Sequence, residues 1–482
     1  MIENILGRAK FKSILNDLYC ADSAEFAVVY GRRRIGKTFL IREYFENQFA
    51  FYHTALSPFE MEKNDGELLL HKQLDSFGYS LRQYGDKHSS APKDWLEAFE
   101  WLKQLLQSKS RRKRIIVFLD ELPWMDTPRS GFVTAFEQFW NGWGAGQHKL
   151  LLLVCGSSTT WITNQLLNNT GGLYGRLTKE IHLPPFTLSE CFDYFNHKNM
   201  GYDYLDVLNC YMAVGGVPYY LSQFSKGKSV AQNIDELCFS HRGKLKDEFE
   251  RLFRSLFNDS EKYMRMVRLL SENREGLNRK QIIDKMQLTS GGGVTDMLRA
   301  LVAGDFVVEY IPYGSSSRDT RYKLVDLFSL FFMRFVENHP TSNVSFWNDN
   351  QLSPALNSWR GYAFEDVCYA HQQQIKKALE IGGVQAEVQP WSSKDINEKA
   401  QIDMLIDRAD HVINLCEMKY SLASYTIDKE YDAELRRKVQ VFLNQTRCKK
   451  SVLLTMITTF GLKENTYSSR VQRTLTLENL FE

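Results

Sequence analysis

Several features that would place this chain in a special class are missing from its sequence. No apolar run among its 482 residues approaches the roughly 20 residues that a membrane-spanning helix needs. The eight cysteines never form a C-x-x-C pair, which argues against a structural zinc site and a disulfide framework. No repeat period or low-complexity tract stands out. The sequence therefore predicts no membrane partner and a reducing compartment.

An excess of charge of one sign is also missing. The 60 Lys and Arg residues nearly balance the 58 Asp and Glu residues, so attraction to a polyanion must come from local patches. The first residues, "MIENILGRAKFKSIL", lack the apolar core of a signal peptide, and we expect a cytoplasmic location. A hydrophobic content of 43% is typical of globular proteins, and the length suffices for about three domains.

A phosphate-binding loop is the first chemical motif. In "FAVVYGRRRIGKTFLIREYF" an apolar β-branched run leads into a glycine loop and then into a helical pattern. The loop fits G-x-x-x-x-G-K-T, so its backbone N–H groups are expected to surround phosphates at a helix N-terminus. Lys37 would reach the β- and γ-phosphates, and the Thr38 hydroxyl would contact Mg²⁺. The predicted nucleotide-binding residues of this loop are Gly31, Arg32, Arg33, Arg34, Ile35, Gly36, Lys37 and Thr38.

Acidic residues follow a second buried strand. In "RIIVFLDELPWM" the apolar run 115–119 ends at Asp120 and Glu121, at the carboxyl end where α/β sheets bind ligands. Asp120 fits the carboxylate that holds Mg²⁺, and Glu121 fits a residue that orients or deprotonates the attacking water. A third strand, "KLLLLVCGSS", ends in Ser157 and Ser158, either of which could sense the γ-phosphate.

Together these motifs resemble a known group of proteins. The segments "YGRRRIGKT", "FLDELPWM", "VCGSS", "LYGRLTKEIHLPPF" and "GGVPYYL" are similar, in this order, to archaeal-type ATPases of the STAND branch of AAA+-like P-loop proteins. The resemblance covers about residues 1–340. It implies that Arg176 contacts the nucleotide phosphates, in its own subunit or from a neighbour, and that Pro218 packs against the adenine. One departure is Ala9, where an acidic residue usually follows Gly-Arg.

The middle of the chain predicts a helical lid and then a winged helix. Residues 187–255 carry apolar positions three and four apart. Residues 261–326 contain three helical patterns and a hairpin signature, "VVEYIPYGSSSRDTRYKLVD". The third helix of such a module can read DNA, but here it carries only Arg299 beside Asp296. A structural role for this module therefore stays open. The polar segment "TSNVSFWNDNQLSPALNS" predicts a linker.

Charged residues interrupt two strand-like runs near the end of the chain. "QIDMLIDR" and "VINLCEMKY" are separated by a turn at residues 409–410, and period-2 alternation places Glu417 and Lys419 on one face. Asp403 would lie beside them on the paired strand. Two adjacent carboxylates are stable together when a divalent cation such as Mg²⁺ neutralises them. A neighbouring lysine can activate water or stabilise charge on a phosphate.

This second constellation resembles the PD-(D/E)XK nuclease fold. The resemblance covers about residues 356–482 and implies a metal site at Asp403 and Glu417, assisted by Glu365 on a helix and by a catalytic Lys419. Ile402 stands where a proline often precedes the aspartate. The basic segment 434–450 supports contact with a phosphate backbone, although charge runs are usually solvated helix faces.

The predicted architecture is α/β: a P-loop NTPase core with a parallel sheet (1–186), a helical lid (187–258), a winged helix (259–340) and a restriction-endonuclease-like α/β domain (356–482). We expect ATP and Mg²⁺ as cofactors, nucleic acid as a partner (DNA rather than RNA) and a possible homo-oligomer. The predicted function is an ATPase coupled to a metal-dependent nuclease. The alternative is an ATP-driven switch whose nuclease fold only binds.

Overall fold

The computed structural model describes residues 5–57, 66–109, 113–168, 171–289, 291–340, 343–395 and 398–482. It divides into two compact units. The first comprises residues 1–185, 254–258 and 299–305, and the second comprises 186–253, 259–298 and 306–482. Among the described residues, no helix combines the length and the apolar character that crossing a membrane requires.

A five-stranded parallel sheet forms the centre of the first unit, in the order β2-β3-β4-β1-β5. Its strands are β1 (Glu25–Tyr30), β2 (Phe51–Thr54), β3 (Ile115–Asp120), β4 (Leu150–Gly156) and β5 (Lys179–His182). Every residue of β3 and β4 is buried, as their continuous apolar runs predict for strands covered on both faces. The parallel sheet predicted for a P-loop protein is confirmed.

Helices cover both faces of this sheet. Alternate residues of β1, β3 and β4 enter two separate apolar cores, one beside α1 and α2 and the other beside α3, α4 and α5. The helices of this unit are α1 (Ala9–Cys20), α2 (Lys37–Tyr44), α3 (Gly66–Gln83), α4 (Trp95–Ser108), α5 (Phe132–Gly142) and α6 (Thr159–Ile162). The three layers hold the carboxyl ends of β1, β3 and β4 at one edge, and this edge carries the predicted nucleotide-binding residues.

Short helices follow from residue 187, where the sequence predicts them. Capping boxes start three of them, with Thr187 and Glu190 at α7, with Asp203 and Asp206 at α8 and with Ser229 and Gln232 at α10. The helices are α7 (Leu188–His197), α8 (Tyr204–Val214), α9 (Pro218–Leu221), α10 (Val230–Ile234) and α11 (Glu248–Leu256).

Three more helices and a small antiparallel sheet come next. The elements are α12 (Ser260–Ser271), β6 (Leu277–Asn278), α13 (Arg279–Met286), α14 (Gly292–Ala303), β7 (Val307–Tyr310) and β8 (Arg321–Leu324). The sheet has the order β6-β8-β7, with β7 and β8 forming the predicted hairpin.

The predicted linker is wrong as a description of residues 343–358. These residues contribute α16 (Phe346–Asp349) and the start of α17 (Pro354–Ala370). Trp347 is 3% exposed and packs edge-on against Phe331, Phe335 and Trp359. Its backbone N–H donates to the Asp235 carboxylate at 2.7 Å. Most residues of this segment are polar, so its composition did not reveal that the Trp347 ring anchors it to α15 (Leu327–Phe331) and to the helix that continues from α15. Residues 341–342 of the linker lie outside the described residues.

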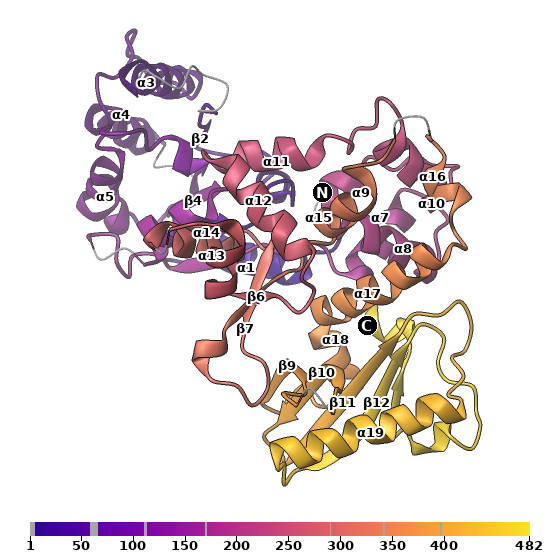
Figure 1. Ribbon diagram of the computed structural model, residues 1–482. Helices are drawn as coiled ribbons and strands as arrows, with labels where there is room; N and C mark the ends of the chain where they lie inside the picture. The colour runs from indigo at the N-terminus through magenta and orange to yellow at the C-terminus, as the bar shows by residue number, and fades with distance from the viewer. Residues whose placement is uncertain are drawn as a thin grey trace. The chain divides into compact units, whose positions relative to one another are not determined.

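A mixed five-stranded sheet with the order β13-β12-β11-β10-β9 forms the C-terminal part of the second unit. Strands β9, β10 and β11 pair antiparallel with one another, whereas β11, β12 and β13 pair in parallel. In Figure 1 the long helix α19 runs across these strands. The elements are α18 (Gln372–Ala378), β9 (Ala386–Ser392), β10 (Gln401–Arg408), β11 (Val412–Lys419), α19 (Lys429–Thr446), β12 (Ser451–Thr458) and β13 (Arg473–Leu475).

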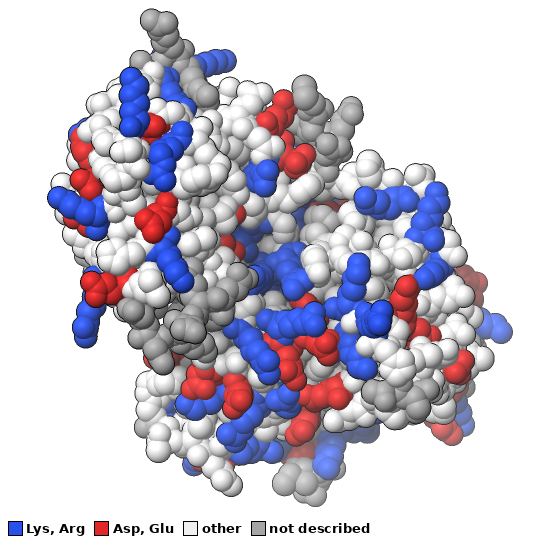
Figure 2. All heavy atoms as spheres, turned by 90° about the horizontal axis from the view of Figure 1, so that it is seen from above, with Lys and Arg blue, Asp and Glu red and all other residues white. Residues whose placement is uncertain are grey.

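The surface charge follows the balanced composition. On the face that Figure 2 shows, Lys and Arg are interspersed with Asp and Glu. The buried charged residues are therefore better guides to a functional site than the exposed ones.

Candidate nucleotide site and a second carboxylate site

The phosphate-binding loop joins β1 to α2 and depends on backbone conformations that favour glycine. Gly31 has φ +139°, and a Cβ added there would lie 2.5 Å from the Leu183 carbonyl oxygen. Gly36 has φ +86° and caps α2 from the left-handed region. Arg34 also adopts a positive φ of 73°. The loop thus curls over the N-terminus of α2, as the motif predicts.

Lys37 lies inside this loop and is 6% exposed. Its Nζ donates to the carbonyl oxygens of Gly31 and Arg32 at 2.9 and 3.0 Å. Burial lowers the pKa of Lys37, while the nearby carboxylates of Glu121 and Asp120 oppose that effect. The ammonium is consequently held at the loop with two acidic groups beside it.

Thr38 and Asp120 meet across the carboxyl edge of the sheet. The Thr38 hydroxyl donates to the two carboxylate oxygens of Asp120 at 3.0 and 3.1 Å. Burial raises the pKa of Asp120, and hydrogen bonds from Cys155 and Thr38 oppose the shift. The Cys155 Sγ donates to Asp120 Oδ1 at 2.6 Å. Sequence reasoning missed Cys155, whose only signal is its place near the end of the neighbouring strand.

Glu121 is oriented by Ser157. The backbone N–H and the hydroxyl of Ser157 both donate to Glu121 Oε2 at 2.9 Å. Glu121 has φ 51°, a left-handed conformation that non-glycine residues rarely adopt and that clusters at functional sites. Of the two predicted serines, Ser157 is therefore the one joined to the candidate base, whereas Ser158 precedes α6.

The other predicted nucleotide-binding residues have varied surroundings. Ile35 is buried in the core beside α2, and Arg32 is 3% exposed. Arg33 lies over the Trp124 ring, with its guanidinium carbon 5.7 Å from the centroid. Arg176 is exposed on a turn before β5. Pro218 begins α9 in the second unit, so its predicted contact with adenine stays a prediction.

The second unit brings Asp403 and Glu417 to neighbouring strands. In the antiparallel register of β10 and β11, Met404 pairs with Cys416, and the two carboxylates belong to the adjoining residues of each strand. Asp403 Oδ2 accepts a hydrogen bond from the backbone N–H of Met418 at 3.0 Å. The turn predicted at residues 409–410 separates the two strands.

Glu417 is fully buried and is held by helix α19. Lys438 Nζ donates to Glu417 Oε2 at 2.7 Å, and the Tyr431 hydroxyl donates to the same oxygen at 3.3 Å. Burial raises the pKa of Glu417 to about 7; Asp403 adds to the shift and Lys438 opposes it. The other oxygen, Oε1, is buried and has no hydrogen-bond partner within the described residues. A buried carboxylate oxygen in this position suits a cation.

Lys419 and Glu365 complete the predicted set from different directions. The Lys419 Nζ lies 5.0 Å from the centre of the Tyr431 ring. Glu365 lies in the C-terminal half of α17. Burial, assisted by Asp403 and Asp366, raises the pKa of Glu365 to about 8. Lys438 and Tyr431 were not predicted as site residues, because only the tertiary packing of α19 reveals which of its side chains face β11.

The donor set at β10 and β11 fits a cation with few protein ligands. No group of three or more His, Cys, Asp or Glu side chains in the described ranges is arranged to hold a metal ion. Asp403 and Glu417 would therefore supply two carboxylates. Mg²⁺ is commonly held by one or two carboxylates, with water and substrate phosphate completing its shell.

Comparison with known proteins assigns the N-terminal part. Residues 9–224 match the family model for an ATPase domain predominantly from Archaea. The uncharacterized protein MJECL04 of Methanocaldococcus jannaschii is 22% identical over 370 residues, which cover 75% of this chain and 76% of that protein. Residues 9–224 thus form an ATPase domain of the archaeal type.

Two solved structures are similar to this chain. The Walker-type ATPase paby2304 of Pyrococcus abyssi is 17% identical, with a TM-score of 0.48, over 69% of this chain and 97% of that one. The ORC2 protein of Aeropyrum pernix is 15% identical, with a TM-score of 0.36, over 71% of this chain and 91% of that one.

Proposed function

We propose that the archaeal-type domain binds ATP with Mg²⁺ and hydrolyses it. The observation that carries the proposal is the convergence of Lys37, Thr38 and Asp120 at the carboxyl edge of the parallel sheet. The Thr38 hydroxyl and the Asp120 carboxylate would hold Mg²⁺, which would neutralise charge on the β- and γ-phosphates. Lys37 would turn from the loop carbonyls to these phosphates. Glu121, oriented by Ser157, would position or deprotonate the attacking water.

Nucleotide binding tests the first half of this proposal. Isothermal titration with ATP and Mg²⁺ should show binding to the native chain and the loss of most affinity in Lys37→Ala. Lys72→Ala is the matched control, because Lys72 is exposed on α3. Unchanged affinity in Lys37→Ala would contradict the assignment.

Two residues outside the loop complete the proposed nucleotide site. Arg176, exposed on its turn, would contact the phosphates in its own subunit or from a neighbouring copy. Pro218 would pack its ring against the adenine without leaving an N–H donor unsatisfied. Light scattering with and without ATP tests whether a homo-oligomer forms, and Arg176→Ala should slow hydrolysis in either arrangement.

Elements α12 to β8 support a winged-helix assignment for residues 259–340. The order is helix α12, short strand β6, helices α13 and α14, and the hairpin β7–β8, as in a winged helix, and the three strands form one antiparallel sheet. The candidate reading helix, α14, would offer little positive charge to DNA, because Arg299 stands beside Asp296. A structural role is therefore favoured for this module.

For the C-terminal sheet we propose a metal-dependent nuclease site. The order α17, α18, β9, β10, β11, α19, β12 and the central position of β11 support a PD-(D/E)XK-like fold. Asp403 and Glu417 would hold the metal ion, which when bound would neutralise charge on the phosphodiester. Lys419 would face the scissile phosphate, and Glu365 would assist from α17. The orphaned Oε1 of buried Glu417 is the strongest support.

A cleavage assay tests this site. The full chain would be incubated with supercoiled plasmid or single-stranded DNA, with MgCl₂ or MnCl₂, in the presence and absence of ATP. Glu417→Gln and Asp403→Asn should abolish cleavage while leaving ATP hydrolysis nearly intact. Glu387→Gln, an exposed residue of β9, is the matched control. Cleavage that persists in both site variants would contradict the nuclease assignment.

One contact favours the alternative of a binding module. The Lys438 ammonium already neutralises Glu417 from α19, so the carboxylate has a protein cation as its partner. In that case ATP turnover would change the conformation of a domain that binds nucleic acid without cutting it. Filter binding of the same DNA, without cleavage under any metal condition, would select this alternative.

A further inference from the structure

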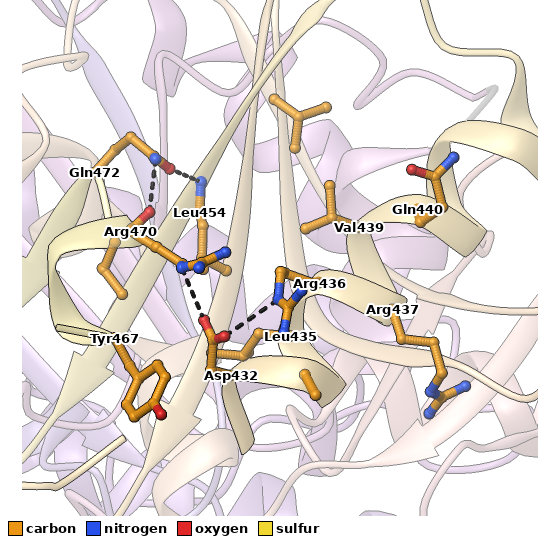
Figure 3. Close-up of a pocket in the computed structure, with 13 residues that line it drawn as sticks. Asp432, Leu435, Arg436, Arg437, Val439, Gln440, Leu454, Tyr467, Arg470 and Gln472 are labelled. Carbon is orange, nitrogen blue, oxygen red and sulfur yellow. Dashed lines mark hydrogen bonds and ion pairs between the residues drawn. The ribbon is translucent and has the colours of Figure 1, made fainter. Parts of the chain in front are cut away.

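A pocket of about 660 Å³ lies on α19, and neither Glu417 nor Lys438 is among the residues that line it. Its walls come from α19, from β12 and from the segment 467–472 (Figure 3). The volume is within the range of small-ligand sites, which span roughly 300 to 1,000 Å³. Most of its α19 wall belongs to the basic segment 434–450.

Asp432 organises the charged side of the pocket. Its carboxylate is buried, with the side chain 4% exposed, and it contacts Arg436 Nε at 3.1 Å and Arg470 Nε at 3.3 Å. Figure 3 shows the two guanidinium groups on either side of this carboxylate. Because each arginine uses its Nε on Asp432, its terminal nitrogens keep their fork geometry for a ligand. Among the described residues, these terminal nitrogens form no hydrogen bond.

The pocket carries a positive charge that Asp432 only partly cancels. Three arginines line it (Arg436, Arg437 and Arg470), against one aspartate. The Arg436 and Arg470 side chains are 58% and 51% exposed, so both can reach a ligand from solvent. Arginine forks match the oxygens of phosphate and carboxylate groups.

Apolar side chains also line the pocket. Val439, Val452, Leu454 and Val471 line it, and the Tyr467 ring lies at its edge. An inorganic anion would leave this surface in contact with water. A ligand with a phosphate and a flat ring would cover it, because bases stack on aromatic and apolar side chains while arginine binds the phosphate.

The pocket shares a sheet face with Glu417. Leu454 pairs with Leu415 in the β11–β12 register, and Glu417 is two residues further along the same strand. Alternation along a strand places Leu415 and Glu417 on one face, and both the pocket and Lys438 use α19. A ligand at the pocket would therefore lie on the same face of this sheet as the second carboxylate site.

We propose that this pocket binds a nucleoside phosphate through Arg436 and Arg470, with the base against its apolar side chains. The nucleoside phosphate is either a free nucleotide or one unit of a nucleic-acid strand, because both present the same phosphate and ring. The proposal requires neither ATP hydrolysis nor strand cleavage.

The test uses the full chain carrying Lys37→Ala, which should remove most nucleotide binding at the loop. The probes are thymidine 5′-monophosphate, thymidine, inorganic phosphate and a fluorescein-labelled oligo(dT) of ten nucleotides, followed by calorimetry or anisotropy. Thymidine monophosphate should bind at least about tenfold more tightly than thymidine or phosphate alone. Equal affinity for phosphate and thymidine monophosphate would overturn the assigned role of the apolar side chains.

Matched variants distinguish the pocket from other basic surfaces. Arg436→Gln and Arg470→Gln should each weaken binding at least about tenfold, whereas Arg473→Gln, an exposed arginine of β13 that does not line the pocket, should leave it unchanged. Because loss of either guanidinium could unsettle buried Asp432, Gln440→Glu provides a second perturbation. Gln440 is an exposed lining residue on α19, so the substitution adds a negative charge without disturbing the core. Unchanged affinity in Gln440→Glu and in both arginine variants would overturn the proposal.

The oligonucleotide arm identifies the source of the ligand. Tighter binding of oligo(dT) than of the mononucleotide, with the same dependence on Arg436 and Arg470, assigns the pocket to a nucleic-acid strand. Binding of the mononucleotide alone, with that same dependence, assigns it to a free nucleotide. The proposal would be overturned if the mononucleotide does not bind and oligonucleotide binding is unchanged in Arg436→Gln and Arg470→Gln.

Discussion

Replacing Lys438 by methionine removes the ammonium that contacts buried Glu417. Glu417 is 0% exposed and the Lys438 side chain is 10% exposed, so solvent cannot take over the lost interaction. Methionine keeps most of the side-chain volume and the apolar contacts of α19. The substitution therefore isolates the effect of the charge.

The expected cost at pH 8 is about 3–5 kcal/mol, the range for leaving one partner of a buried ion pair unpaired. Glu417 escapes part of that cost by binding a proton. Burial already raises its pKa to about 7 from an ordinary value of 4.5, and losing Lys438 raises it further. A group whose pKa is raised in the folded state stabilises the fold at pH values below its unfolded pKa. This stabilisation is lost as the pH rises through the folded pKa. The destabilisation by Lys438→Met should consequently be large at pH 8 and small at pH 5.

Hydrogen exchange of β11 amides, followed by mass spectrometry, measures this cost locally. A local measurement is needed because a chain of two units does not unfold in one transition. Lys429→Met, at the exposed start of the same helix, is the control and should change the opening free energy by less than about 0.5 kcal/mol. Glu417→Gln combined with Lys438→Met should recover most of the loss, because no buried charge remains unpaired. A loss below about 1 kcal/mol at pH 8, or an equal loss at pH 5, would refute the reasoning.

Three further predictions concern other buried contacts. His371 accepts a backbone hydrogen bond at 2.9 Å, and burial lowers its pKa to about 4. The second unit should therefore lose about 3 kcal/mol of stability as the pH falls from 6.5 to 4. His371→Gln should remove this pH dependence, measured by hydrogen exchange. Gly216→Ala should reduce soluble expression and thermal stability, because its Cβ would lie 1.9 Å from the Phe186 carbonyl oxygen; unchanged melting would contradict this. Ser157→Ala should slow ATP turnover roughly fivefold without changing ATP affinity, because one of two hydrogen bonds to Glu121 is lost, and steady-state kinetics would show the split.

Local signals were enough to predict the backbone conformation of the glycine loop and the buried strands beside it. Gly31 and Gly36 occupy backbone conformations that the motif requires, and the apolar runs before Asp120 and Ser157 are strands buried on both faces. The glycine spacing and the apolar runs that predict these features each lie within a short stretch of the sequence. Motif spacing and strand composition therefore carry them directly.

Contacts between distant segments were not predictable in the same way. Lys438 follows Glu417 by 21 positions, and only the angle at which α19 packs on the sheet brings the two together. Cys155 reaches Asp120 because β3 and β4 are neighbours in the sheet. Trp347 was read as part of a linker because its flanking residues are polar, although one large buried ring is enough to anchor a segment.

ATP turnover by Glu121→Gln tests the central claim most directly. The variant keeps the shape of the side chain at the end of β3 but cannot deprotonate water. The account predicts that it binds ATP as the native chain does and hydrolyses it about 10²-fold or more slowly. Glu100→Gln, an exposed glutamate of α4, should match the native rate. Native turnover in Glu121→Gln, or loss of ATP binding in the same variant, would contradict the account.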